Sequence, residues 1–266
     1  MKRRDALLSL SLALGAGLGG LPALAQAQVQ SLNDAINKAG RQRMLSQRMS
    51  KAWLAQLQAN EATRLAPQVL ERSMALFERQ LGELRAFAPS AELRTTYDDL
   101  GTAWSNYKAT LTEGSPVRER AGKLLSLDAR VLALAHQGTV QYEAALSKPV
   151  GKLVNVAGRQ RMLSQRMAKF YFVAALQIEN TQALTEITKS RTEFMAATEL
   201  LRNAPEATPA IRDQLALADH QWFFFDQALN NIQQASPKAL SDVFVASENL
   251  LSVMDQVTGL YAGLKA

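Results

Sequence analysis

The chain has 266 residues, 47% of them hydrophobic, and a formal net charge of +6. This length is enough for one large domain or two small domains, each with its own core. Cysteine is absent, which excludes disulfides, thiolate metal sites and cysteine nucleophiles. No long Lys/Arg run or basic-aromatic pattern occurs, so we expect no nucleic-acid partner.

Residues 1–25 have the features of a secretory signal peptide: basic Lys2–Arg4, an apolar run and a small-x-small cleavage site at Ala23–Ala25. Arg3-Arg4 also resembles a twin-arginine signal, so both export routes stay open. An uncleaved anchor is the alternative, because Ala6–Ala25 is nearly long enough to span a bilayer. Gly and Pro near its end favour cleavage. We therefore expect a periplasmic mature chain with a charge of about +4 and no transmembrane segment.

The rest of the chain is rich in helix-forming residues and shows no alternating strand pattern or hairpin signal. Two halves follow one plan of four helices joined by short connections. Trp104 and Trp222 occupy matching places, and Ser-Pro pairs at 115–116 and 236–237 should each begin a fourth helix. The expected helices cover about 31–60, 63–87, 90–111 and 115–147, then about 149–180, 181–203, a helix from 208, and 236–264. We predict an all-α fold of tandem duplicated four-helix up-down bundles with pseudo-twofold symmetry, divided into units 26–148 and 149–266.

One eleven-residue stretch occurs twice without change. Ala39–Met49, AGRQRMLSQRM, returns as Ala157–Met167, 118 residues later. The match extends outward to Asn37 and Asn155, and then to Lys51 and Lys169. Elsewhere the halves agree only loosely, and a packing helix rarely needs every polar residue preserved. This motif is therefore the candidate functional element.

On a helical wheel, Arg43 shares an apolar and small-residue stripe with Gly40 and Gln47. Glycine inside a helix costs about 1 kcal/mol relative to alanine, so its two copies indicate a close backbone approach. An arginine in such a stripe must reach water, find a carboxylate or bind an anion, and the motif holds no Asp or Glu. Two converging guanidinium groups would suit a planar oxyanion in a bidentate manner. Two alternatives remain: the arginines extend to solvent, or the motif only specifies helix packing.

The pattern Ile36-Asn37-x-Ala39-Gly40-x-x-Arg43-Met44-x-Ser46-x-Arg48 resembles the sensory domain of PilJ-type methyl-accepting transducers of type IV pilus systems. It is also similar to the periplasmic signature helix of nitrate/nitrite sensor kinases. The second resemblance implies that the arginine before methionine, here Arg43 and Arg161, contacts the anion where two such helices meet. Those receptors have membrane-spanning helices and a signalling module, and this mature chain shows neither.

We therefore expect a non-enzymatic sensory or binding protein for a small oxyanion, nitrate or nitrite by resemblance, that passes its state to a membrane receptor or transporter. The alternative is a helical interaction module of a type IV pilus, chemosensory or envelope system without a small ligand. No nucleophile-base set, phosphate loop or metal-ligand spacing is present, so we expect no enzyme, cofactor or metal. The candidate ligand-binding residues are Arg43, Arg161, Gly40, Gly158, Gln47, Gln165, Asn37, Asn155, Arg48 and Arg166.

Several other residues attract a plainer interpretation. Arg41, Arg159, Arg48 and Arg166 lie on a more outward arc, where a surface or partner contact is favoured, although Arg48 and Arg166 match a family position. The two histidines, His136 and His220, should be ordinary surface residues, since neither recurs 118 residues away. The aromatic run Trp222–Phe225 should be buried between neighbouring helices. Asp98-Asp99 should be a solvated carboxylate pair.

Overall fold

The computed structural model describes residues 28–58, 61–178, 180–230, 232 and 236–265. Within these residues the secondary structure is helical: eight α-helices and two short 3-10 turns. The first half holds α1 (Leu32–Ala55), α2 (Ala66–Phe87), α3 (Ala91–Thr112) and α4 (Ala121–Leu146), with 3-10 turns at Glu61–Arg64 and Arg118–Arg120. The second half holds α5 (Pro149–Ala175), α6 (Asn180–Asn203), α7 (Pro209–Leu229) and α8 (Pro237–Ala262). This confirms the predicted all-α fold.

Local sequence signals explain where several helices begin. The side-chain oxygens of Ser31, Ser90, Thr208 and Ser236 each accept a hydrogen bond from a backbone N–H in the first turn. Proline stands at the start of α5, α7 and α8, where its missing N–H has no helical partner to lose.

Some predicted boundaries were wrong. The Ser-Pro pair at 115–116 does not begin a helix, because a loop and the turn Arg118–Arg120 precede α4. The first helix ends at Ala55 instead of near residue 60, and a 3-10 turn separates it from α2. The second unit was predicted to begin at residue 149, and α5 begins there. The division into units 26–148 and 149–266 stays a prediction.

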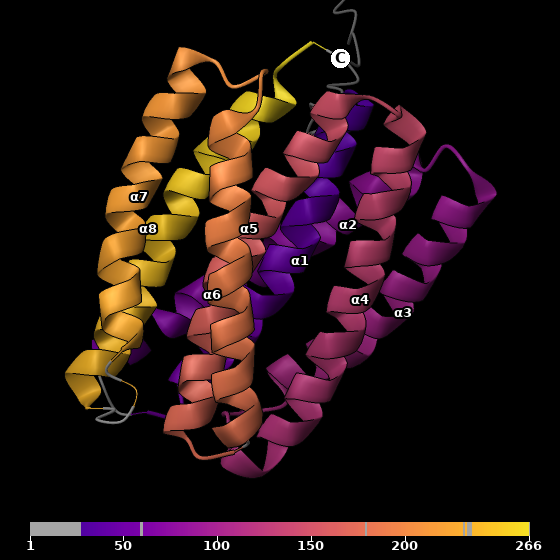
Figure 1. Cartoon of the computed structure of the whole chain (residues 1–266). Helices are drawn as coiled ribbons and strands as arrows, with labels where there is room; N and C mark the ends of the chain where they lie inside the picture. The colour runs from indigo at the N-terminus through magenta and orange to yellow at the C-terminus, as the bar shows by residue number, and fades with distance from the viewer. Residues whose placement is uncertain (1–27, 59–60, 179, 231, 233–235, 266) are drawn as a thin grey trace, which may run out of the picture.

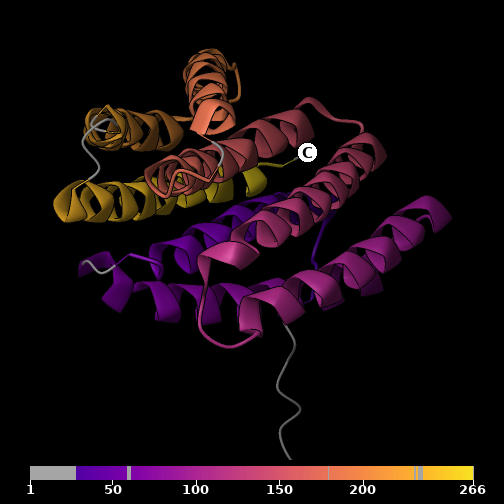
Figure 2. The same ribbon diagram turned by 90° about the horizontal axis from the view of Figure 1, so that it is seen from below.

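The two motif helices, α1 and α5, lie side by side at the centre of the molecule (Figure 1). Helix α1 also packs against α2 and α4 of its own half, and α5 packs against α6 and α8. Figure 2 shows the result as layers, with α6 and α7 at one edge and α2 and α3 at the other. One hydrophobic core contains residues from all eight helices, so the two halves share it.

Matching contacts in the two halves support the pseudo-twofold relation. The Phe77 and Trp104 rings stack at 4.3 Å between centroids, and Phe194 and Trp222 stack at 4.5 Å. The amide of Gln42 donates to the Phe77 carbonyl, and that of Gln160 donates to the Phe194 carbonyl. Duplicated sequence thus gives duplicated packing around the central helices.

Candidate functional site

The central helices come closest at the two motif glycines. A Cβ atom on Gly40 would lie 3.8 Å from the Gly158 Cα, and a Cβ on Gly158 would lie equally far from the Gly40 Cα. The Gly40 Cβ would also lie 3.2 Å from Arg43 Nη2 and 3.5 Å from Arg161 Nη2. The close approach expected from the glycines is therefore present, and it places both arginine side chains at the same crossing.

Arg43 and Arg161 are buried and converge at this crossing. Their exposed fractions are 1% and 0%. From the distances to the Gly40 Cβ position, their Nη2 atoms are no more than about 7 Å apart. Each reaches across to the opposite motif helix: Arg43 Nη2 donates to the carbonyl and Oδ1 of Asn155, at 3.2 and 2.7 Å, and Arg161 Nη2 donates to the carbonyl of Asn37 at 3.0 Å. Neither arginine extends to solvent, which removes one of the alternatives.

The two arginines differ in the partner that the fourth helix of each half supplies. Asp255 on α8 pairs with Arg161 Nη1 and, at 2.8 Å, with Arg41 Nη2. His136 on α4 lies with Nδ1 3.3 Å from Arg43 Nη1. Among the described residues no carboxylate forms an ion pair with Arg43. The motif arginine of the first half is thus without an ion-pair partner among the described residues, and the carboxylates of Glu143 and Glu193 act on it only at longer range.

The pKa values reflect this environment. Burial, with the positive charges of Arg159 and Arg161, lowers the pKa of Arg43 to about 9. Burial and Arg41 lower that of Arg161 to about 10, despite the opposing effect of Asp255. Burial raises the pKa of Asp255, but Arg161 and Arg41 outweigh it and hold the value at about 2. Burial and the charges of Arg43 and Arg159 lower the pKa of His136, so a neutral imidazole accepts the hydrogen bond from Arg43.

His136 and Asp255 occupy equivalent positions, although they are 119 residues apart and not 118. The register of the fourth helices comes from matching contacts. Tyr142 donates its hydroxyl to the Leu84 carbonyl, and Tyr261 donates to the Leu201 carbonyl. Asp128 accepts from the Gln47 amide, and the Ser247 carbonyl accepts from the Gln165 amide. In this register Ala129 is equivalent to Glu248.

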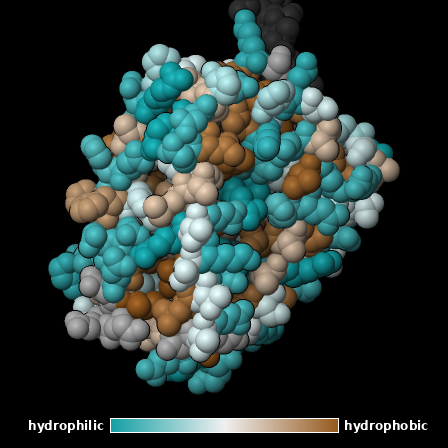
Figure 3. Space-filling model, in the orientation of Figure 1, coloured by the Kyte–Doolittle hydropathy of each residue, from teal (hydrophilic) through white to brown (hydrophobic). Residues whose placement is uncertain are grey.

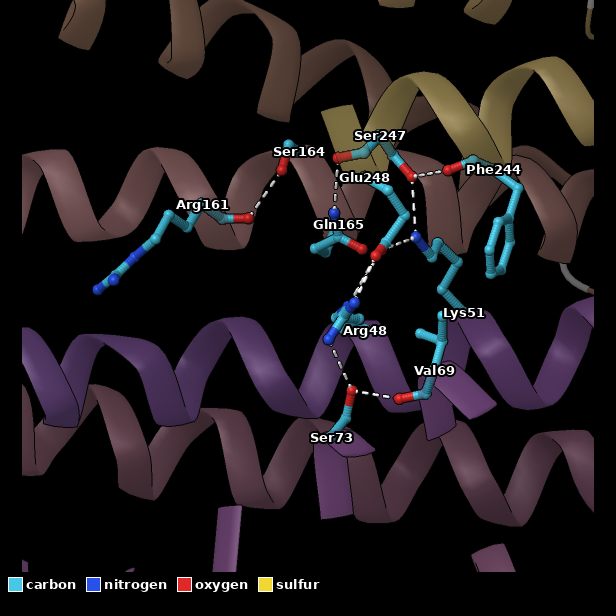
Figure 4. Close-up of polar contacts among 10 residues, drawn as sticks. All are labelled: Arg48, Lys51, Val69, Ser73, Arg161, Ser164, Gln165, Phe244, Ser247 and Glu248. Carbon is cyan, nitrogen blue, oxygen red and sulfur yellow. Dashed lines mark hydrogen bonds and ion pairs between the residues drawn. The ribbon is translucent and has the colours of Figure 1, made fainter. Parts of the chain in front are cut away.

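A second group of charged side chains surrounds Glu248 (Figure 4). Arg48 donates through Nε to both oxygens of Glu248, at 3.0 and 3.1 Å, and Lys51 Nζ lies 2.7 Å from Oε1. Lys51 has no exposed side-chain surface and also stands over the Phe244 ring. Burial lowers the pKa of Lys51 to about 8, against the effect of Glu248. Burial raises the pKa of Glu248, but Lys51 and Arg48 hold it at about 2.

The second motif has its own version of this group. Lys169 Nζ lies 2.6 Å from Asp128 of α4, which is fully buried, and 4.3 Å from the Phe170 ring centroid. Arg166 pairs with Glu186 of α6 at 2.6 Å, and Arg159 pairs with Glu193 of α6. Each buried lysine therefore links its motif helix to the fourth helix of the other half.

A cleft of about 590 Å³ opens between α4, α5 and α6 and reaches Arg43. Its polar lining includes His136, Arg159 and Glu193, and its apolar lining includes Leu132 and Phe170. The face shown in Figure 3 carries α4 and α6, with hydrophobic surface in the hollows between polar ridges. Arg43 is thus the motif arginine that a ligand from this face would meet.

The structure brings only some of the predicted residues together. Arg43, Arg161, Gly40, Gly158 and the two asparagines, Asn37 and Asn155, meet at the helix crossing. Gln47 and Gln165 direct their amide donors to Asp128 and to the Ser247 carbonyl instead. Arg48 and Arg166 pair with Glu248 and Glu186.

Three plainer interpretations need correction. Arg41, Arg159, Arg48 and Arg166 are half-buried and pair with carboxylates of this chain, because α2, α6 and α8 cover the outward arc. His136 lies at the helix surface as predicted, but it contacts Arg43. In the aromatic run Phe225 is buried, whereas Phe223 and Phe224 are 58% and 62% exposed, since α7 lies at the edge of the molecule. Asp98 and Asp99 are exposed, as expected.

Sequence reasoning missed Asp255, Glu248, Asp128 and the contact of His136. These residues lie on the fourth helices, where the repeat offset differs by one residue from that of the motif. A comparison of the halves that allowed a one-residue slip would have placed His136 opposite Asp255.

The protein is thus an all-helical bundle with a duplicated, arginine-bearing helix pair at its centre. The family model described as "PilJ: Type IV pili methyl-accepting chemotaxis transducer N-term" matches residues 24–137 and again residues 142–246. The chain therefore belongs to the PilJ family and holds two tandem copies of this domain, which confirms the resemblance. No curated protein and no solved structure matches the chain.

Two further findings concern the described residues alone. None of their helices is both long enough and apolar enough to cross a membrane. They also contain no cluster of His, Cys, Asp and Glu side chains that could hold a metal ion. The expected signal peptide lies outside the described residues.

Proposed function

We propose that this PilJ-family protein is a periplasmic, non-enzymatic sensory or binding protein for a small oxyanion, nitrate or nitrite. The anion would lie beside Arg43 and Arg161, at the crossing of α1 and α5. The observation that carries the proposal is the convergence of two buried guanidinium groups at Gly40 and Gly158. In a single chain, the duplicated motif would build a site that the related sensor kinases build by pairing two chains.

Two features of the ligand-free protein favour the binding of an anion at the crossing: repulsion between like charges and buried donors without partners. Like charges close together in a buried site repel, and the charge of Arg161 helps to lower the pKa of Arg43. The Nε donors of both arginines are buried without a hydrogen-bond partner among the described residues. An unsatisfied buried donor costs about 1–3 kcal/mol. A planar oxyanion would relieve the repulsion and supply acceptors for the guanidinium donors.

Arg43 would contribute more than Arg161 to the affinity. Asp255 already compensates Arg161, whereas His136 provides Arg43 with a neutral acceptor. The cleft between α4, α5 and α6 gives access to Arg43. We therefore expect unequal contributions of Arg43 and Arg161 to the affinity, whereas a symmetric clamp would make them equal.

Calorimetry and thermal unfolding with sodium nitrate or nitrite test the proposal, with sodium chloride at equal ionic strength as the reference. Stabilisation should grow with the logarithm of ligand concentration above the dissociation constant. Arg43→Ala should weaken binding about 10- to 100-fold, the range for a charged hydrogen bond. Arg85→Ala is the matched control, since Arg85 forms an exposed pair with Asp98. A nitrate response that equals the chloride response, or survives Arg43→Ala unchanged, would refute the proposal.

A bound state must reach a partner, and the described helices include no membrane span. We propose that the protein passes its state to a membrane receptor or transporter. The alternative function is a helical interaction module of a pilus, chemosensory or envelope system with no small ligand. The exposed rings of Phe223 and Phe224 favour it, because a contiguous exposed apolar patch often marks a protein contact. Pulldown from the periplasm with wild type and Phe223→Ser/Phe224→Ser, alongside Arg43→Ala, separates the two functions.

A further inference from the structure

The two halves place their compensating carboxylates on different helices. Around α1, Asp255 and Glu248 of α8 pair with Arg41 and Arg48. Around α5, Glu193 and Glu186 of α6 pair with Arg159 and Arg166. Both pairs of carboxylates thus belong to the second half: one pair lies on its fourth helix, α8, and the other on its second helix, α6.

The equivalent positions on the other two helices, α4 and α2, carry uncharged side chains. On α4, Ala129 and His136 stand where α8 carries Glu248 and Asp255. On α2, Val69 and Leu76 stand where α6 carries Glu186 and Glu193, by the register that the Phe77/Phe194 contacts define. This arrangement neutralises the outer arginines on both sides.

The arrangement differs at the inner arginines. Asp255 reaches inward to Arg161 as well as outward to Arg41, whereas Glu193 forms its ion pair with Arg159. Of the buried and half-buried cations that line the cleft, Arg159, Arg166 and Lys169 have carboxylate partners and Arg43 has none among the described residues. Lys189 is exposed at the cleft lining and solvated. An anionic group that enters the cleft would therefore pair with Arg43, on which Glu143 and Glu193 act only at longer range.

The rest of the cleft indicates what is attached to that group. Leu125, Leu132, Met162, Leu163 and Phe170 supply apolar lining between α4 and α5. The volume of about 590 Å³ is in the range of sites for organic molecules and far exceeds that of a three-oxygen ion. Ala129 and Ala133 of α4 line the cleft with small side chains, which leave room for a ligand.

We propose that the cleft binds an organic monocarboxylate with an apolar body. Its carboxylate pairs with Arg43, as the Asp255 carboxylate pairs with Arg161, and its body lies along the apolar walls of α4 and α5. This inference rests on the proposed function only in taking Arg43 as the anion-binding group. It differs in ligand class, because an inorganic oxyanion would leave the apolar walls uncovered.

Isothermal titration of the mature protein with sodium acetate, butanoate, hexanoate and octanoate tests this. Each CH₂ that enters the cleft should tighten binding about fourfold. Octanamide, which keeps the chain and lacks the charge, should bind at least tenfold more weakly than octanoate. A response independent of chain length, or equal binding of octanamide, would overturn the inference.

Two variants inside the cleft and one control outside it locate the site. His136→Asp gives Arg43 the carboxylate that Arg161 has, so it should abolish octanoate binding. Val140→Asp, one turn further along α4 and exposed, adds the same charge outside the cleft lining and should leave binding within about twofold. Ala133→Trp should fill the cleft and reduce octanoate affinity to that of acetate. Octanoate binding that survives His136→Asp and Ala133→Trp would place the acid elsewhere and refute the inference.

Nitrate in the same titrations separates this inference from the proposed function. If nitrate binds and the affinity for the carboxylates does not rise from acetate to octanoate, the inference is refuted and the oxyanion function stands. Octanoate binding without nitrate binding does the reverse. If neither nitrate nor octanoate binds, both the proposed function and the inference are refuted.

Discussion

Glu248 offers the sharpest test of how the buried charges hold the two halves together. Its carboxylate links Arg48 and Lys51 of α1 to α8 of the other half. Lys51 has no exposed side-chain surface, and Ser247 Oγ, at 2.8 Å, is its other close partner. Glu248→Gln keeps the volume and removes the charge. It leaves a buried ammonium and a half-buried guanidinium without a counter-charge.

Breaking a buried ion pair by removing one partner costs about 3–5 kcal/mol. The Glu248 side chain is 22% exposed, so solvent screens part of this, and we expect about 3 kcal/mol. For a chain of this size that loss lowers the melting temperature by about 6–12 °C. Calorimetry and urea unfolding at pH 7 measure the two quantities.

Glu186→Gln is the matched control, because Glu186 pairs with the equivalent Arg166 and is 20% exposed. The buried lysine of that motif, Lys169, forms its ion pair with Asp128, and Glu186 acts on it only at longer range. Its loss should be about 1 kcal/mol. Lys51→Met with Glu248→Leu should recover most of the stability that Glu248→Gln loses. Equal losses for the two glutamine variants would contradict the role assigned to buried Lys51.

Two further predictions concern acid stability and the helix crossing. Asp255 and Glu248 have pKa values of about 2 in the folded protein, below their ordinary 3.8 and 4.5. Their stabilisation should therefore be complete above about pH 4.5 and decline towards pH 2. Urea midpoints from pH 6 to pH 2 should show this, with a shallower decline in Glu248→Gln, and a flat wild-type profile would contradict the assignment. Gly40→Leu should push α1 away from the Gly158 backbone and cost more than about 2 kcal/mol. Gly101→Leu, where a Cβ meets no atom within 4 Å, should be neutral or stabilising, and equal effects would deny the close crossing.

The repeat in the sequence was enough to predict the fold. An exact repeat indicates that the two motif helices occupy equivalent places, and two glycines inside helices indicate a close approach of the backbones. The inward position of Arg43 and Arg161 and their convergence follow from those two facts, and the helix-forming composition without strand signals predicted the all-α architecture. The helix starts were predicted less well, because a Ser-Pro pair is compatible with a loop as much as with a helix. The loop before Arg118–Arg120 shows this.

The ion-pair partners could not be predicted because they belong to helices distant in sequence. Asp255 is 94 residues from Arg161, and Glu248 is 200 residues from Arg48. Their pairing depends on which face of α8 meets α5 and α1. A change of one residue in the repeat offset rotates a helix by roughly 100°. The equivalence of His136 and Asp255 is therefore lost when the halves are aligned on the motif alone.

The placement of carboxylates on α6 and α8 shows how a duplicated protein can become asymmetric without changing its fold. Both halves carry the same motif arginines, so each half brings the same positive charge to the crossing. The outer arginines of α1 take their counter-charges from α8, and those of α5 take theirs from α6. The inner arginine is different: it takes its carboxylate from Asp255 of α8, and the equivalent place on α4 holds His136. The second half thus pairs its inner arginine with a carboxylate of its own, whereas the first half offers its inner arginine a neutral imidazole.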